Sequence, residues 1–174
     1  GKRVLLIDLD SQASLTISVG LEPLEVERTI VDVLRKDGTP FMECVQQLSD
    51  RLHIVTSIID LAPMEMELLS RASREKILDR ALREARGQYD YILIDCPPQL
   101  SILTINALSC ADGVVIPVKT DYLAYRGLTQ LQDSIRGAQG AAVTPSAETR
   151  KRSNSTRKKT ATKAARSKAG AEAE

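Results

Sequence analysis

Histidine and cysteine are scarce in this chain. Its 174 residues include one histidine, His53, and three cysteines, Cys44, Cys96 and Cys110, which lie far apart in sequence. A structural zinc site needs four such side chains, usually in closely spaced pairs. The pattern therefore excludes a zinc site. An odd number of cysteines, in a sequence without a recognisable secretion signal, indicates reduced thiols, and we expect a cytoplasmic location.

Long apolar runs are also missing. No segment approaches the roughly 20 consecutive apolar residues that cross a bilayer, so we expect no membrane association. The composition, 43% hydrophobic and 27% charged, is typical of a soluble α/β domain, and the length is sufficient for one substantial core.

The net charge of +1 conceals an asymmetry along the chain. Residues 138–174 contain nine Lys or Arg and three Glu, a charge of +6, so the rest of the chain carries −5. Residues 137–174 contain almost no large apolar side chain, and we expect this basic low-complexity tail to be disordered. Phosphate contacts with nucleic acid and a solvated linker role both remain open for it, and it has no aromatic side chain to stack on bases.

Two apolar runs end abruptly in carboxylates. Residues 4–10 end with Asp8 and Asp10, and residues 91–95 end with Asp95. Continuous Val, Ile and Leu runs predict parallel strands covered on both faces, and ligands of such sheets bind beyond the carboxyl ends of the strands. We therefore expect the three acids to converge at one edge, where they hold a hydrated Mg²⁺ or orient a water molecule. The competing interpretation is structural, with a carboxylate capping a helix.

Helical and strand patterns alternate along the rest of the chain. This alternation predicts a doubly wound, mostly parallel sheet with helices on both faces. Apolar spacing predicts helices at residues 29–35, 42–48, 61–69, 73–87 (with Ser73 as N-cap), 102–108 and 125–135, and further strands at 52–56 and 114–118.

These segments together resemble the ParA/Soj family of partition ATPases, which are deviant Walker P-loop proteins. The resemblance covers residues 1–136. It is carried by residues 1–12 (GKRVLLIDLDSQ), 52–69, 73–75 (SRE), 89–98 (YDYILIDCPP), 103–108 (LTINAL), 116–118 (IPV) and 127–128 (GL).

The resemblance implies an enzyme that binds ATP and Mg²⁺ and forms a face-to-face homodimer. In this family the dimer binds DNA non-specifically, and a centromere-binding ParB-like partner stimulates hydrolysis, so the implied location is cytoplasmic and nucleoid-associated. By position, Asp10 matches the acid that orients the attacking water. Asp95 matches the Walker B acid, which holds Mg²⁺ through water, and Asp8 lies near the metal.

The sequence departs from the family pattern in several places. Ser11 and Ala13 replace a Pro and a Gly of the family, and no glycine-rich Walker A loop occurs in the 174 residues, so no nucleotide-binding residue is assigned. We expect residues 1–136 to be a partial ATPase domain, truncated at both ends and without the P-loop strand and helix. In the family that strand lies beside the Asp95 strand, so its loss would leave backbone groups of the sheet unpaired.

Three other interpretations compete with this one. A receiver domain would place its phosphoacceptor one βαβαβ unit after the first acids, whereas Asp95 follows Asp10 by 85 residues. A membrane-cycling MinD-like protein needs an amphipathic C-terminal helix, and the tail has no apolar face. The third is a non-hydrolysing ParA-like remnant that acts as an interaction or DNA-tethering module through its basic tail.

Overall fold

The computed structural model describes residues 1–117; the expected helix at 125–135 and the basic tail lie outside this range. None of the helices in this part of the chain is sufficiently long and apolar to pass through a membrane. The elements are β1 (Val4–Asp8), α1 (Ser14–Ser18), η1 (Pro23–Glu25), α2 (Ile30–Leu34), η2 (Phe41–Cys44), β2 (Gln46–Ser49), β3 (Leu52–Val55), α3 (Leu61–Leu69), η3 (Arg74–Lys76), α4 (Ile77–Ala81), β4 (Tyr91–Asp95) and α5 (Ile102–Cys110).

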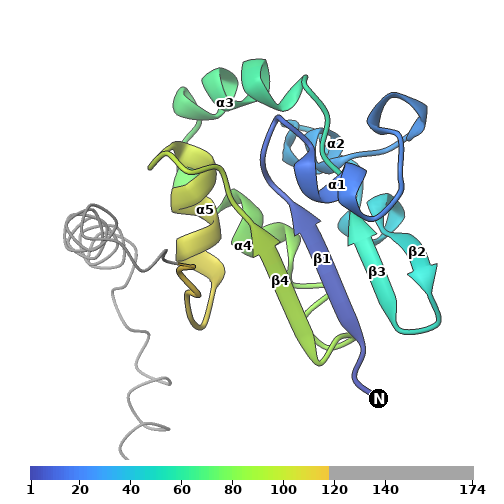
Figure 1. Cartoon of the computed structure of the whole chain (residues 1–174). Coiled ribbons are helices and arrows are strands. Elements are labelled where there is room, and N and C mark those ends of the chain that lie inside the picture. Colours follow the sequence, from blue (N-terminus) through green and yellow to red (C-terminus); the bar gives the residue numbers. More distant parts are fainter. Residues whose placement is uncertain (118–174) are drawn as a thin grey trace, which may run out of the picture. The chain divides into compact units, whose positions relative to one another are not determined.

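The four strands form one sheet in the order β2-β3-β1-β4 (Figure 1). β1 pairs in parallel with both β3 and β4, and β2 pairs antiparallel with β3. Parallel neighbours need crossover connections, which the helical segments between them provide. The predicted α/β class with a mostly parallel sheet is confirmed.

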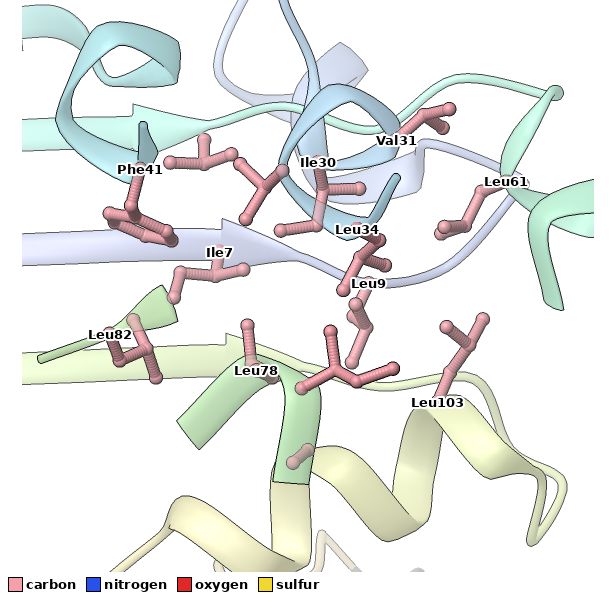
Figure 2. Packing of buried hydrophobic residues seen from close by; sticks show 14 of the residues in the cluster. Ile7, Leu9, Ile30, Val31, Leu34, Phe41, Leu61, Leu78, Leu82 and Leu103 are labelled. Atoms are coloured by element: carbon pink, nitrogen blue, oxygen red, sulfur yellow. The ribbon is translucent and has the colours of Figure 1, made fainter. Parts of the chain in front are cut away.

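The core lies on one face of the sheet. Leu5 and Ile7 of β1 are completely buried there, and the helices α2, α3, α4 and α5 contribute many of the other members of the cluster, together with Val55 of β3 and with Phe41 and Cys44 of η2 (Figure 2). The opposite face carries the alternate strand residues, and on β4 these are more than half exposed, at 56% for Tyr91 and 54% for Leu93. The helices that build the core of residues 1–117 therefore cover one face.

Residues 29–35 form the expected helix, and its start is held by a capping box. Thr29 precedes α2; its side chain accepts from a backbone amide of the first turn, and the Asp32 carboxylate accepts from the Thr29 amide at 2.9 Å. The helix predicted at residues 42–48 is wrong. A short 3₁₀ turn ends at Cys44, and residues 46–49 become β2. Pairing with β3 outweighs the local helical spacing of these residues.

The prediction that Ser73 caps a helix is also wrong. Ser73 adopts a left-handed conformation with φ 51° and makes no side-chain cap. The cap comes from α5, where buried Asn106 accepts from the Leu78 amide at 3.1 Å and donates to the Arg74 carbonyl at 2.8 Å. The expected apolar face is present, since Ile77, Leu78, Leu82 and Ala85 are buried, but the α-helix covers only Ile77–Ala81.

β4 is an edge strand among the described residues. The Tyr91 amide donates to Arg3 and the Asp95 carbonyl accepts from Leu9, so the backbone groups of these odd-numbered residues face β1. Because strand amides alternate in direction, those of Ile92 and Ile94 face the open edge. The expectation of unpaired backbone groups beside the Asp95 strand therefore holds within residues 1–117.

A groove of about 1030 Å³ runs along this edge, between β4, α5 and residues 111–117. The strand predicted at residues 114–118 does not form over residues 114–117, which have no regular structure. Val115 is 93% exposed. Within residues 1–117, this segment has strand-forming side chains but pairs with no strand.

The edge of β4, which is open within residues 1–117, leads us to expect that the 174-residue chain self-associates. An apolar edge strand without Pro or Lys is a template for pairing with another chain. We expect Leu93→Lys to reduce the associated fraction in sedimentation velocity runs over a range of protein concentrations. Met66→Lys is the matched control, because Met66 is 69% exposed on α3, away from β4. An equal reduction by both variants, or a wild-type chain that stays monomeric throughout, would contradict the prediction.

Candidate functional site

The structure places Asp8 and Asp95 side by side. They are the last residues of β1 and β4 and are direct partners in the parallel register. Residues paired in this way project from the same face of the sheet, here the face opposite the core. Asp10 follows two residues later in the loop before α1. The expected convergence of acids at the carboxyl edge is therefore present for Asp8 and Asp95, with Asp10 on the adjoining loop.

Asp8 is completely buried and its carboxylate is held by three hydrogen bonds. One oxygen, Oδ2, accepts from the backbone amide of Thr16 at 2.8 Å and from its hydroxyl at 2.7 Å. The other, Oδ1, accepts from the Asp10 amide at 3.2 Å. The contacts of Asp8 therefore agree with a structural role, because its carboxylate anchors α1 and the loop that leads to it.

Asp10 is half-buried at the start of a tight turn. Its Oδ1 accepts from the Gln12 amide at 3.0 Å, and its carbonyl accepts from the Ala13 amide at 2.9 Å. Ala13 has φ 53° and ψ 31°, a left-handed conformation that glycine adopts without strain. A glycine, which the resemblance implies at this position, would adopt this conformation without strain. The turn forms here despite the methyl group of Ala13.

Asp95 lies in a strongly anionic environment. Burial raises its pKa above the ordinary value, and the charges of Asp8 and Asp10 raise it further, against a smaller lowering by the Cys96 amide. Its side chain also lines the groove along β4. Repulsion among these carboxylates favours a bound cation.

The carboxylates at this edge could bind a metal ion only if other ligands complete its coordination shell. No three potential metal-binding side chains within residues 1–117 converge closely enough to form a protein cage. Mg²⁺ is commonly bound by one or two carboxylates, with waters and substrate phosphates completing its shell. Asp95 can hold such an ion through water, whereas Asp8 would have to give up existing hydrogen bonds to contact it.

Sequence reasoning missed the residues that support this edge. Thr16 and Ser57 are completely buried, and the Ser57 amide donates to the Thr16 hydroxyl at 3.1 Å. A polar Thr eight positions after Asp8, in a short helix, was the one available signal. The side-chain hydroxyls of Thr56 and Ser57 are buried without a hydrogen-bond partner in the described structure.

His53 and Cys96 have structural surroundings that do not point to catalysis. His53 hydrogen-bonds through Nδ1 with the Tyr89 hydroxyl at 2.7 Å, with the two rings in an edge-to-face arrangement. Burial, followed by the charge of Asp95, raises the pKa of the Cys96 thiol to about 11. A thiol of that pKa is mainly protonated near neutrality, which disfavours a nucleophilic role for Cys96.

Comparison with known proteins gives a consistent picture. A family model described as an AAA domain matches residues 1–145. The sporulation initiation inhibitor protein Soj of Bacillus subtilis is 44% identical over 136 residues, covering 78% of this chain and 54% of Soj. The chromosome partitioning protein ParA of Myxococcus xanthus is 40% identical over 135 residues, covering 77% and 47%. The chain spans about half the length of these curated relatives.

Solved structures share the same fold. A cobyrinic acid a,c-diamide synthase from Mycobacterium smegmatis, crystallised with an ATP analogue and magnesium, superposes with a TM-score of 0.75 at 38% identity, covering 80% of this chain and 57% of that one. A plasmid partition protein from Borrelia burgdorferi gives a TM-score of 0.69 at 26% identity, covering 79% and 61%. Proteins of different named activity share this architecture, so the residues of the site have to carry the functional argument.

The charge environment predicts opposite pH effects at two aspartates. Because the folded chain raises the pKa of Asp95, ionisation there destabilises the fold, and stability is regained as the pH falls through the raised pKa. Asp95→Asn should therefore raise the urea midpoint near pH 7, and this gain should vanish in acid.

Asp90 is the control. The Arg3 amide, then Lys2, hold its pKa below the ordinary value, so its stabilisation is present above the unfolded pKa and is lost as the pH falls. Asp90→Asn should lower the urea midpoint near pH 7. Shifts of the same sign in both variants would contradict this account of the edge.

Proposed function

The chain belongs to the ParA/Soj family of partition ATPases, and from that premise we propose that it forms part of an enzyme that hydrolyses ATP with Mg²⁺ during the partitioning of plasmid or chromosomal DNA. The observation that carries the proposal is the pairing of Asp8 with Asp95 at the carboxyl ends of neighbouring parallel strands, with Asp10 on the adjoining loop. A carboxylate just beyond a rigid strand is held in place without loop flexibility.

Each acid has a separate proposed role. Asp10, which is partly accessible, orients the water that attacks the terminal phosphate. Asp95 holds Mg²⁺ through water, and the raised pKa of its carboxyl group is consistent with a place prepared for a cation. Asp8 belongs to the same metal-facing edge. Its three hydrogen bonds support an indirect contribution, in which it fixes the positions of the Asp10 loop and of α1.

When bound, Mg²⁺ supplies charge neutralisation for the phosphates. The residues of this chain provide the acidic half of such a site. The 174 residues contain no glycine-rich loop with a phosphate-binding lysine, so we propose that another segment supplies the phosphate cradle. Further parts of the proposal are a homodimer formed with ATP, non-specific binding to DNA, a ParB-like partner that stimulates hydrolysis, and a cytoplasmic, nucleoid-associated location.

The decisive experiment compares two proteins. One is the 174-residue chain, and the other is the same chain preceded by the residues that its gene encodes in frame before Gly1. We expect phosphate release with Mg²⁺ and ATP from the longer protein and none from the shorter one. In the longer protein, Asp10→Ala should reduce kcat by about 100-fold or more while fluorescent ATP still binds, because the change removes water orientation and leaves the phosphate contacts.

Asp50→Ala serves as the control, because Asp50 lies in the turn between β2 and β3 and is exposed. It should leave kcat unchanged. If the longer protein neither binds nor hydrolyses ATP, or if Asp10→Ala retains full kcat, the proposed function fails.

The charge of the tail favours one second candidate, a DNA-tethering module that does not hydrolyse ATP. With nine basic and three acidic residues, residues 138–174 can neutralise phosphates. This candidate predicts a DNA mobility shift that is independent of nucleotide, weakens steeply with salt and disappears when residues 138–174 are deleted. DNA binding that survives the deletion would remove the tail from the argument.

A further inference from the structure

The side chain of Thr16 joins two strand ends. Its hydroxyl donates to Asp8 Oδ2 at 2.7 Å and accepts from the backbone amide of Ser57 at 3.1 Å. Its own amide donates to the same Asp8 oxygen at 2.8 Å. Thr16, Asp8 and Ser57 are all completely buried, so water cannot replace any of these contacts without opening the structure.

The Asp8 carboxylate closes the loop that carries Asp10. Oδ1 accepts from the Asp10 amide near the start of the loop, and Oδ2 accepts from Thr16 at its end in α1. The loop between them contains the left-handed Ala13. The position of Asp10 therefore depends on Asp8, and the orientation of Asp8 depends on the Thr16 hydroxyl, which supplies one of its three hydrogen bonds.

The Ser57 contact extends this network to the segment after β3. The carbonyl of the preceding residue, Thr56, accepts from the Ile30 amide at 2.8 Å, which fixes the start of α2. Four residues beyond Ser57, α3 begins at Leu61 and lies past the carboxyl ends of the strands (Figure 1). One buried hydrogen bond, from Ser57 to Thr16, thus links the segment leading to α3 with the Asp10 loop.

We infer that Thr16 is a positioning residue: it couples the Asp10 loop to the segment that joins β3 to α3, so that a displacement of either one is transmitted to the other. The role of Asp10 in this inference rests on the proposed function. The coupling itself concerns only the contacts of residues described above.

The test is amide hydrogen exchange of the 174-residue chain without nucleotide, at a concentration where it is monomeric. Thr16→Val keeps the shape and removes the hydroxyl. It should accelerate exchange at Ser57 and Asp10 by about tenfold, the effect of losing one buried hydrogen bond, and leave the β1 amide of Leu5 unchanged. Thr16→Ser keeps the hydroxyl and should remain within about threefold of wild type.

Thr104→Val is the matched control. The Thr104 hydroxyl, on α5, donates to the exposed carbonyl of Gln99 at 2.7 Å. Removing this hydroxyl should leave exchange at Ser57 and Asp10 unaltered. Equal acceleration at Leu5 and Ser57 in Thr16→Val would show a general loss of stability and overturn the inference. Unchanged exchange at Ser57 and Asp10 would overturn it as well.

Catalysis provides a separate measurement in the longer protein defined above. If that protein hydrolyses ATP, Thr16→Val should lower kcat by about tenfold with little change in KM, and Thr16→Ser should restore it. If it does not hydrolyse ATP, the proposed function fails, while the exchange experiment still decides the coupling.

Discussion

The hydrogen bonds of the Asp8 carboxylate hold the candidate site in its present geometry. A fully buried carboxylate is costly unless its oxygens are satisfied, and here the bonds come from Thr16 and Asp10. The cost of burial therefore favours an ordered loop: any arrangement in which Asp10 or α1 moves away removes at least one hydrogen bond from this buried carboxyl group. The parallel pairing of β1 with β4 then sets Asp95 beside this fixed point.

The accessible part of the site results from the asymmetry of the sheet. Asp8 and Asp95 project from the face that the core helices leave uncovered, which also carries the exposed Leu93. Asp8 is sealed on that face by Thr16, whereas Asp95 remains open toward the groove along β4. Two identical side chains at matching register positions therefore differ in their surroundings: Asp8 anchors a loop, whereas Asp95 remains accessible.

Local patterns in the sequence predicted β1, β4 and the proximity of their terminal acids, because continuous apolar runs and the geometry of parallel strands suffice for that. They also predicted a helix at residues 29–35, since its apolar spacing is a local pattern; the structure has α2 at Ile30–Leu34. They failed where a distant partner decides the conformation. Residues 46–49 form a strand because β3 lies beside them, and the cap of α4 comes from Asn106, 28 positions beyond Leu78.

Local sequence patterns could not predict the role of Thr16 in the site for the same reason. Its importance comes from Ser57, 41 positions later, and no periodicity connects the two. Similarly, the separate roles of Asp8 and Asp95 depend on which side chains cover each of them. A sequence pattern can indicate that acids gather at an edge, but the three-dimensional contacts decide which of them is available to a ligand.

The strand order affects how the protein folds while it is being synthesised on the ribosome. β1 lies between β3 and β4, yet its pairing with β4 joins residues that are 87 positions apart, such as Val4 and Tyr91. At common translation speeds that interval lasts on the order of ten seconds, far longer than a small domain needs to collapse. During this time the side of β1 that pairs with β4 in the folded protein has no partner strand, which leaves the backbone of an apolar segment open to non-native contacts.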